Sequence, residues 1–424
     1  MLNNFFNKIK LVFEDRTLSR RILFVVMILL LFRLGANIPI PGVNVAELEN
    51  LFAGNQFLGL LNVFSGGGLS NISILMLGVG PYITASIIMQ LLTMMFPALK
   101  ELYHESGEEG RRKFTQFSRL LTVPLALLQG YGLLALLQGQ GVVFDLTFAQ
   151  TAVNVVVIAT GSIILMWLGE LINEYGIGNG VSLLIFAGIV AGIPAAIGQL
   201  AVNYAASQIP IYLAFVVAAI LIVAGVILVT EAERPIPVTY AKQVRGNRVY
   251  GGLSTYLPIR VNQAGVMPII FALSILLFPQ MLINFLSGVD NATVKTIADS
   301  LLAVLNNTWV YAILYFVLVF VFTYFYSAIT FDPEAISHNL QKSGAFIPGI
   351  RPGEPTARHI SKIVTRLTLV GALFLGLVAM LPLIMQAVTG LAALAIGGTA
   401  LLIVVSVALD FVKQVDAQTT LREY

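Results

Sequence analysis

Residues 210–229 read PIYLAFVVAAILIVAGVILV, a run of 20 residues without a charge. Crossing about 30 Å of hydrocarbon takes roughly 20 mostly apolar residues, so this run is long enough to span a membrane. Lipid offers no partner to backbone N–H and C=O groups, and the run lacks the alternation of a barrel strand, so we expect an α-helix. Together with nine similar runs, the expected spans lie near residues 20–36, 75–96, 116–138, 153–172, 181–200, 210–229, 264–286, 309–330, 363–386 and 393–412.

The composition also favours a membrane protein. Of the 424 residues, 58% are hydrophobic and 11% are charged, and the mean hydropathy is +0.89. An ordinary soluble domain carries about 25% charged residues. The sequence therefore predicts an all-α polytopic membrane protein with ten transmembrane helices. It contains no cysteine, which excludes disulfides. The first 20 residues predict an amphipathic arm rather than a cleaved signal peptide, because no short apolar run with a small-residue cleavage site follows.

Lysine and arginine gather on one side of the ten crossings. Of the 24, all except Arg33 and Lys295, that is 22, fall in the N-terminal arm, the C-terminus or the loops of that side. Cytoplasmic loops of membrane proteins are enriched in Lys and Arg. We therefore expect this side and both termini to face the cytoplasm. The net charge of +3 and the pI near 9.0 then reflect the loops rather than a nucleic-acid-binding domain.

Two halves of five spans each are expected, residues 1–205 and 206–424. Because five is odd, the second half enters the membrane from the opposite side, which is an inverted topology. A local repeat supports this division, since the pattern G-V-x-P-x-I-x-A occurs at 78–85 and again at 265–272. A chance match between apolar helices is the alternative. The proline of each copy either bends a helix or marks where it begins.

Residues 57–70 read FLGLLNVFSGGGLS and lie between the first two expected spans. This stretch is too short and too rich in glycine to cross a membrane. One interpretation is a short apolar helix that folds back into a protein-lined cavity as a re-entrant piece. The other is a helix that lies on the membrane surface. The residues alone leave both open.

Two long inner loops, about residues 230–262 and 331–361, carry much of the positive charge. The first predicts a β-hairpin that turns at Gly246-Asn247, with Arg245 and Arg248 at its tip. Planar guanidinium groups there can bind carboxylates or phosphates of a partner. Arginines on a hairpin also serve simply as solvated side chains, and this is the alternative.

The second loop begins with Asp332-Pro333, which predicts a capped helix with proline at its first position. This short helix is expected to end at Gly344. Arg351 follows among prolines and glycines, which restrict the backbone and fix how the side chain is presented. It is a candidate docking residue, and an internal ion pair with Glu354 or Asp332 is the alternative.

The sequence lacks the residue patterns typical of enzymes and of transporters driven by ion gradients. The centres of the expected spans hold no Asp, Glu, Lys or His, whereas proton-driven transporters keep ionisable groups there. A phosphate-binding G-x-x-x-x-G-K-[ST] loop is absent, and the three histidines lie in inner loops. We expect no enzyme activity, no cofactor and no metal site, but a passive conduit driven by something bound from the cytoplasm. A secondary transporter for a small solute is the alternative, and an intramembrane enzyme is the third reading.

Several stretches resemble the SecY family of protein translocation channels, and the resemblance covers essentially the whole chain. They are GPYITASIIMQLL (80–92), YGIGNGVSLLIFAGIVAG (175–192), YAKQVRGNRVYGG (240–252), LPIRVNQAGVMPIIFA (257–272), GAFIPGIRPGEPT (344–356) and GGTALLIVV (397–405).

The resemblance implies an hourglass pore closed at its waist by a ring of aliphatic side chains. Such a ring resists water and ions and still fits loosely around a passing polypeptide. The ring residues are Val79, Ile83, Ile185, Ile189, Ile270 and Ile403. The stretch 57–70 resembles the family's plug, which sits outside the ring and moves away when a chain enters. The plug residues are Phe57, Leu60, Leu61, Val63, Phe64 and Gly67.

A lateral gate is also implied, formed by spans two and three against spans seven and eight. Hydrophobic segments reach lipid through it. Gln90 and Asn262 resemble members of a polar cluster that tunes this gate.

The inner loops resemble those with which the family binds the SecA motor ATPase or a ribosome, through Arg245, Arg248 and Arg351. Asn247 stands at a hairpin position that is basic in some relatives, a departure that weakens the expected contact with ribosomal RNA. Further expected partners are the small membrane subunits SecE and SecG, the translocating polypeptide with its signal sequence, and membrane lipids. The expected location is a bacterial plasma membrane.

Overall fold

The chain forms a mostly helical structure in two compact units, which are described separately. The computed structural model describes residues 15–41, 61–62, 65–69, 71–104, 107–139, 141–143, 146–202, 209–240, 243–245, 248–250, 254–287, 292–305, 307–389 and 392–423. The first unit comprises Met1–Val216, Leu273–Tyr311 and Pro382–Tyr424. The second comprises Val217–Ala272 and Ala312–Leu381. The N-terminal arm expected before the first span lies outside the described residues, and the expected division into halves stays a prediction.

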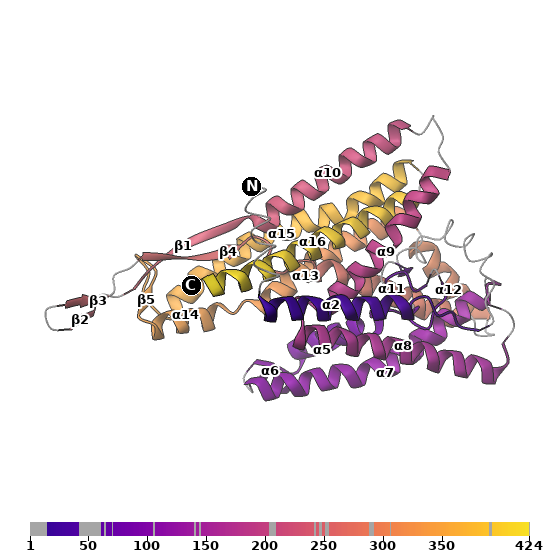
Figure 1. The fold of residues 1–424 in the computed structure, drawn as a ribbon, viewed down its shortest axis with the longest axis horizontal. Helices are drawn as coiled ribbons and strands as arrows, with labels where there is room; N and C mark the ends of the chain where they lie inside the picture. The colour runs from indigo at the N-terminus through magenta and orange to yellow at the C-terminus, as the bar shows by residue number, and fades with distance from the viewer. Residues whose placement is uncertain are drawn as a thin grey trace. The chain divides into compact units, whose positions relative to one another are not determined.

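A helix is present at each of the ten expected spans (Figure 1). These helices are α2 (Arg16–Gly35), α5 (Gly80–Met95), α7 (Gly107–Gly139), α8 (Phe148–Tyr175), α9 (Gly180–Val202), α10 (Ile209–Glu231), α11 (Met267–Ser287), α13 (Thr308–Thr330), α15 (Glu354–Thr389) and α16 (Ala392–Glu423). Three helices lie between them, namely α6 (Pro97–His104), α12 (Ala292–Leu305) and α14 (Pro333–Lys342).

Fewer than ten of these helices are both long enough and apolar enough to count as complete membrane spans. Within the described residues, four helical stretches are long and apolar enough: Glu108–Gly139, Phe148–Tyr175, Thr308–Lys342 and Glu354–Met385. The pair Gly80–Thr93 and Pro97–Tyr103, bent by 113°, makes a fifth if it is one span. Shorter apolar helical stretches are Gly180–Pro194, Val216–Glu231 and Met267–Gln280. The helical class is confirmed, and the count of ten spans stays a prediction.

The first unit is built from helices that pack in sequence order. Contacts join α5 to α7, α7 to α8 and α8 to α9, while α2 and α16 both pack against α9. Gly161 on α8 allows the non-helical stretch before α5 to approach closely, because a methyl group built there would overlap the carbonyl oxygen of Ile74. An ion pair of 2.7 Å between Arg119 and Glu170 joins α7 to α8.

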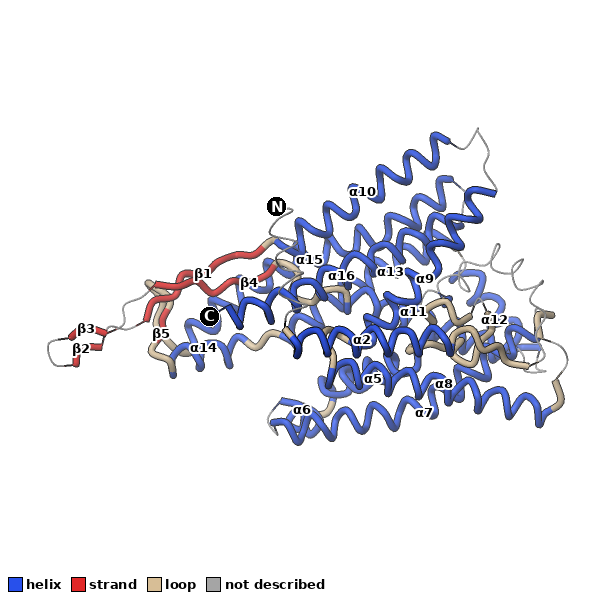
Figure 2. Tube along the Cα trace, viewed as in Figure 1, coloured by secondary structure: helices blue, strands red, loops and turns tan. Residues whose placement is uncertain are grey.

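The second unit carries a small antiparallel sheet in the order β4-β1-β5, drawn in red in Figure 2. Its strands are β1 (Glu233–Tyr240), β4 (Ser254–Arg260) and β5 (Ala345–Phe346). Two further strands, β2 (Gln243–Arg245) and β3 (Arg248–Tyr250), pair with each other. The predicted pairing of these two strands is therefore confirmed, while the expected turn at Gly246-Asn247 lies outside the described residues. Strand β5, which ties the second inner loop to the first, was not predicted.

The sheet covers a small apolar core. Alternate residues of β1, Ile236 and Val238, are buried, as is Ile259 of β4. The rest of this core comes from the second loop and the start of α15, through Ala345, Ile347, Ile360 and Val364. The two inner loops thus fold together as one body.

The start of α14 agrees with the sequence prediction. Asp332 caps the helix, and one carboxylate oxygen accepts from the backbone N–H groups of Glu334 at 2.9 Å and Ala335 at 3.1 Å. Ser343 caps the other end, and Gly344 follows with φ of 69° in the left-handed region. This is the stop that the glycine predicted.

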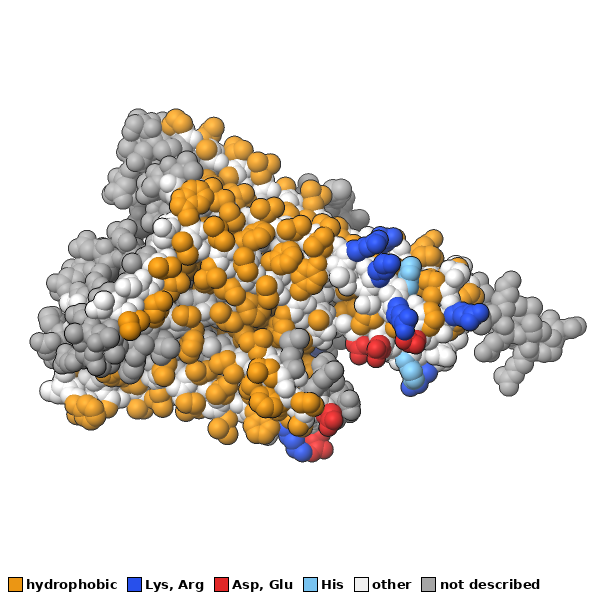
Figure 3. Space-filling model, turned by 180° about the vertical axis from the view of Figure 1, so that it is seen from behind, with side chains coloured by type: hydrophobic (Ala, Val, Ile, Leu, Met, Phe, Trp, Pro, Cys, Tyr) orange, Lys and Arg blue, Asp and Glu red, His pale blue; other side chains and the backbone are white. Residues whose placement is uncertain are grey.

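Hydrophobic side chains dominate the outer surface of the helices. On the face shown in Figure 3 they cover most of the described helical surface, and Lys, Arg, Asp, Glu and His side chains gather outside this area. Leu213, Ile220 and Leu228 on α10 are all more than 60% exposed. An apolar area of this extent is unusual on a soluble monomer and suits contact with lipid.

The sheet core gives a prediction about the two inner loops. Replacing Ile259, 1% exposed, with alanine should destabilise the loops by about 2–5 kcal/mol, since it leaves a cavity in their shared core. Protease added to the protein in lipid nanodiscs should then cut residues 230–262 faster. Tyr256→Ala on the same strand is the control, since Tyr256 is 66% exposed. Equal cutting of both variants would contradict the shared core.

Candidate functional site

All six expected ring residues are described and buried. Val79, Ile83, Ile185, Ile189, Ile270 and Ile403 are 2%, 3%, 1%, 9%, 1% and 0% exposed, respectively. Five belong to the first unit, in which the helix that carries Ile185 and Ile189 packs against the helix that carries Ile403. Ile270 belongs to the second unit. The ring itself, as a convergence of the six on one axis, stays a prediction.

The two copies of the internal repeat start their helices in the same way. Gly78 and Gly265 adopt left-handed φ angles of 58° and 60°. In each copy the helix begins two residues later, so that the proline is its second residue. Pro81 and Pro268 therefore mark helix starts, where the missing N–H costs nothing.

This start places an isoleucine one turn inside each helix. The backbone N–H of Ile83 donates to the carbonyl of Val79 at 3.1 Å, and that of Ile270 donates to Val266 at 3.3 Å. The sequence echo thus corresponds to a repeated local structure, with Ile83 and Ile270 at equivalent positions.

The stretch before α5 is non-helical and buried. Within the described residues 65–69 and 71–79, the side chains of Leu69, Ile72 and Met76 are completely inaccessible to solvent. Of the expected plug residues, Leu61 is 4% exposed and Gly67 has a φ of 81°, while Phe57, Leu60, Val63 and Phe64 lie outside the described residues. Burial of this kind favours the re-entrant interpretation over a helix on the membrane surface.

The backbone N–H and C=O groups of this stretch form hydrogen bonds with other backbone groups of the protein. Ile40 N–H donates to the carbonyl of Ile72, and Ile74 N–H donates to that of Ile38, both at 3.0 Å. Ser73 N–H donates to Gly68 at 3.0 Å. Irregular backbone at membrane depth is tolerated only where it is satisfied by protein in this way.

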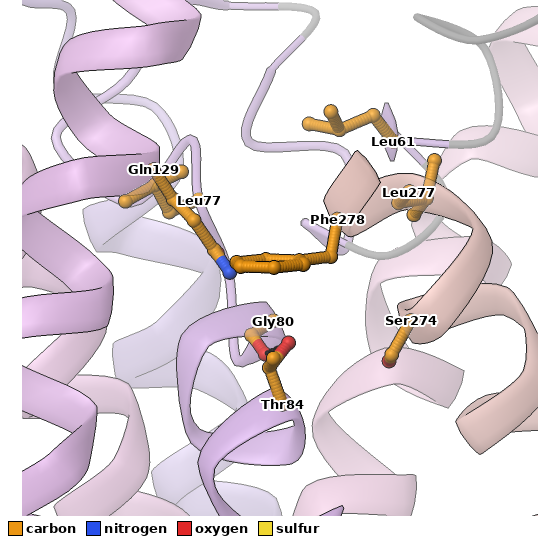
Figure 4. A pocket seen from close by; sticks show the side chains of 8 residues that line it. All are labelled: Leu61, Leu77, Gly80, Thr84, Gln129, Ser274, Leu277 and Phe278. Atoms are coloured by element: carbon orange, nitrogen blue, oxygen red, sulfur yellow. Dashed lines mark hydrogen bonds between the residues drawn. The ribbon is translucent and has the colours of Figure 1, made fainter. Parts of the chain in front are cut away.

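A small pocket lies in the first unit where three helices meet (Figure 4). The Phe278 ring of α11 points toward Gln129 of α7, above the start of α5. The volume of about 30 Å³ has room for about one water molecule. The lining residues are Leu61, Leu77, Gly80, Thr84, Gln129, Ser274, Leu277 and Phe278.

Sequence reasoning missed the polar members of this pocket. Thr84 Oγ1 donates to the carbonyl of Gly80 at 3.0 Å, whereas the buried Ser274 Oγ makes no hydrogen bond within the described structure. Gln129 is 4% exposed. The available signal was a glutamine, Gln129, in the middle of the apolar run 116–138.

The two expected gate residues belong to different units and are described in each. On α5, Gln90 has a buried side-chain oxygen that makes no hydrogen bond in the described structure. Asn262 has the same property at Oδ1, while its Nδ2 donates to the carbonyl of Gly265 at 3.3 Å. Both side chains hold unused hydrogen-bonding capacity in an apolar setting.

Two of the expected docking arginines lie in strands and the third lies in a loop. Arg245 ends β2, Arg248 begins β3, and the two pair in register, while residues 246–247 between them lie outside the described residues. Arg351 is exposed, and its carbonyl accepts from Thr356 Oγ1 at 2.8 Å. Glu354 forms its ion pair with Arg358 at 2.5 Å, and Asp332 caps α14. The alternative ion pairs of Arg351 are thus absent from the described structure.

No metal centre accompanies these features in the part of the chain that the structure describes. Groups of three or more His, Cys, Asp or Glu side chains able to hold an ion are absent there. The described residues of the site thus comprise buried aliphatic side chains, buried polar atoms without a hydrogen bond and one exposed arginine, Arg351.

Known proteins share this sequence over nearly its full length. The family model described as SecY matches residues 73–412. A protein translocase subunit SecY from Streptomyces coelicolor is 43% identical over 434 residues, which cover 97% of this chain and 97% of the relative. The SecY subunit of Vibrio cholerae is 43% identical over 415 residues, 96% of this chain and 93% of the relative.

Solved structures agree in fold. A structure described as a protein conducting channel has a TM-score of 0.67 and 20% identity, over 94% of this chain and 92% of that chain. Sec61 in a canine ribosome-channel complex from the endoplasmic reticulum has a TM-score of 0.63 and 19% identity over the same shares. The family match and the near-complete overlap with relatives at 43% identity lead to one conclusion: this chain belongs to the SecY family, the multi-pass, non-enzymatic channel subunits of the Sec protein translocase.

Proposed function

We propose that this chain conducts secretory polypeptides across a bacterial plasma membrane through a pore that is closed at rest by the ring of six aliphatic side chains, called the collar from here on. The observation that carries the proposal is the repeated helix start, which gives Ile83 and Ile270 equivalent positions in α5 and α11. Burial of all six collar candidates supports it. The proposed topology is ten spans in two inverted halves, 1–205 and 206–424, with both termini in the cytoplasm.

The chemistry of the collar suits a passage for many different sequences. Valine and isoleucine side chains form no directional bonds, so they impose no sequence requirement on a passing chain. A narrow apolar constriction also excludes water and ions when it is empty. Residues 57–70 are proposed to act as the plug beside this collar, supported by the burial of Leu61 and Leu69.

Lateral release of hydrophobic segments is proposed at the seam of α5 and α7 with α11. The pocket there brings Thr84, Gln129 and Ser274 together. An apolar signal sequence would gain little from these polar groups, so it would move on toward lipid. Gln90 and Asn262 are proposed to contribute in the same way, because each holds an unused buried acceptor.

The energy that drives a polypeptide through the pore must come from a bound partner, since the chain belongs to a family of non-enzymatic pores. We propose that the SecA motor ATPase or a ribosome docks on the inner loops through Arg245, Arg248 and Arg351. The Sec61 relative seen in a ribosome-channel complex supports the second of these. SecE and SecG are the proposed membrane partners.

Crosslinking tests the collar. A photoreactive residue at Ile83 or Ile270 should crosslink to a secretory chain stalled in transit, because both would face the passage. A probe at Leu91, which is on α5 and 37% exposed, is the control and should label the chain far less. Labelling by the Leu91 probe alone would remove Ile83 and Ile270 from the collar.

Charge reversal tests the docking residue. Arg351→Glu should reduce motor-dependent export by about tenfold or more, because an exposed cation that pairs with a partner's carboxylate would become repulsive. Export into inverted membrane vesicles measures this. Lys362→Glu, an equal change at another exposed position, should have little effect. Unimpaired export with Arg351→Glu would exclude the residue from docking.

A further inference from the structure

The glycine run at residues 66–68 lies against α9 with no side chain between the two backbones. A methyl group built on Gly188 would overlap the Cα and carbonyl atoms of Gly66. A methyl group built on Gly66 would lie 3.3 Å from the Cα of Gly188 and 2.6 Å from the ring of Phe32. Any residue larger than glycine at position 188 must therefore displace the loop.

The contact is on the face of α9 that carries two collar candidates. Gly188 follows Ile185 by three residues and precedes Ile189 directly. Positions three and four apart share one side of a helix, so Ile185 is next to both Gly188 and Ile189 on that side. The loop thus rests beside these isoleucines.

The loop holds its own shape. Ser65 Oγ donates to the carbonyl of Asn62 and accepts from Leu69 N–H, both at 3.0 Å. Ser73 Oγ donates to Gly68 at 2.9 Å. These bonds lie within residues 62–73, so displacement of the loop from α9 would leave them intact.

We propose that Gly188 is the seat of the plug, a positioning residue whose missing side chain lets the plug backbone rest on α9 in the closed channel. The inference rests on the proposed function and deepens it, because it names the surface that receives the plug. A contact between two backbones, without interlocking side chains, is close enough to seal and can separate without rotamer changes in either partner.

A thiol reporter tests the seat directly. The chain has no cysteine, so Leu69→Cys supplies a single thiol at a position 0% exposed and keeps the hydrogen bonds of the Ser65 hydroxyl. In proteoliposomes, Gly188→Ala should raise its labelling by a membrane-impermeant maleimide about tenfold, the order of effect of one added methyl in a close-packed site. Gly192→Ala is the control, one turn along the same helix, where an added methyl meets nothing within 4 Å.

A second pair of variants keeps the proposal testable if Gly188→Ala is expressed poorly. Gly66→Ala changes the loop side of the contact, where the added methyl group meets the ring of Phe32 at 2.6 Å and the Cα of Gly188 at 3.3 Å. Gly344→Ala is its control, because Gly344 has a similar φ, 69° against 66°, and open space around it. If Gly188→Ala cannot be obtained, faster labelling in Gly66→Ala than in Gly344→Ala supports the seat.

Ion conductance across the same membranes separates the seat from the proposed function. Faster labelling with an ion leak at rest supports both. Faster labelling without a leak supports the seat but contradicts the role of the loop in closing the channel. Labelling of Gly188→Ala and Gly66→Ala at the rate of their controls overturns the seat.

Discussion

Backbone polar groups cannot remain unpaired in hydrocarbon, and this constraint shapes the structure. Helices satisfy it within each span. Residues 65–79 depart from helix and satisfy it by other means, through bonds such as Ile74 N–H to Ile38 and Ser162 Oγ to the carbonyl of Gly78. Because these groups are paired inside the protein, an irregular segment can lie among spans.

The same stretch connects three parts of the proposed channel. It ends at the start of α5, where Val79 and Ile83 lie, and it begins at the loop that rests on Gly188. It also contributes Leu77 to the pocket beside α7 and α11. Buried apolar side chains such as Leu69, Ile72 and Met76 contribute much of the packing here, and apolar contacts are non-directional. They suit the movement proposed for the plug.

Much of the fold could be predicted from the sequence because its signals are local. An uncharged run predicts a helix by itself, and Asp332-Pro333 predicts a helix start. Strand β5 could not be predicted, since its two residues, Ala345–Phe346, become a strand only by pairing with β1. The site was harder, because Gln129 and Ser274 are solitary polar residues until packing brings α7 and α11 together. The importance of Gly188 likewise depends on a loop more than a hundred residues earlier.

The most direct test of this account is amide hydrogen exchange across residues 65–79 in the resting protein in lipid nanodiscs. The account predicts that Ser73, Ile74 and Met76, whose N–H groups donate to carbonyls at 2.9–3.0 Å, exchange as slowly as amides in the middle of α8. Exchange at the rate of an unprotected peptide would contradict a satisfied, buried segment and the closed channel built on it.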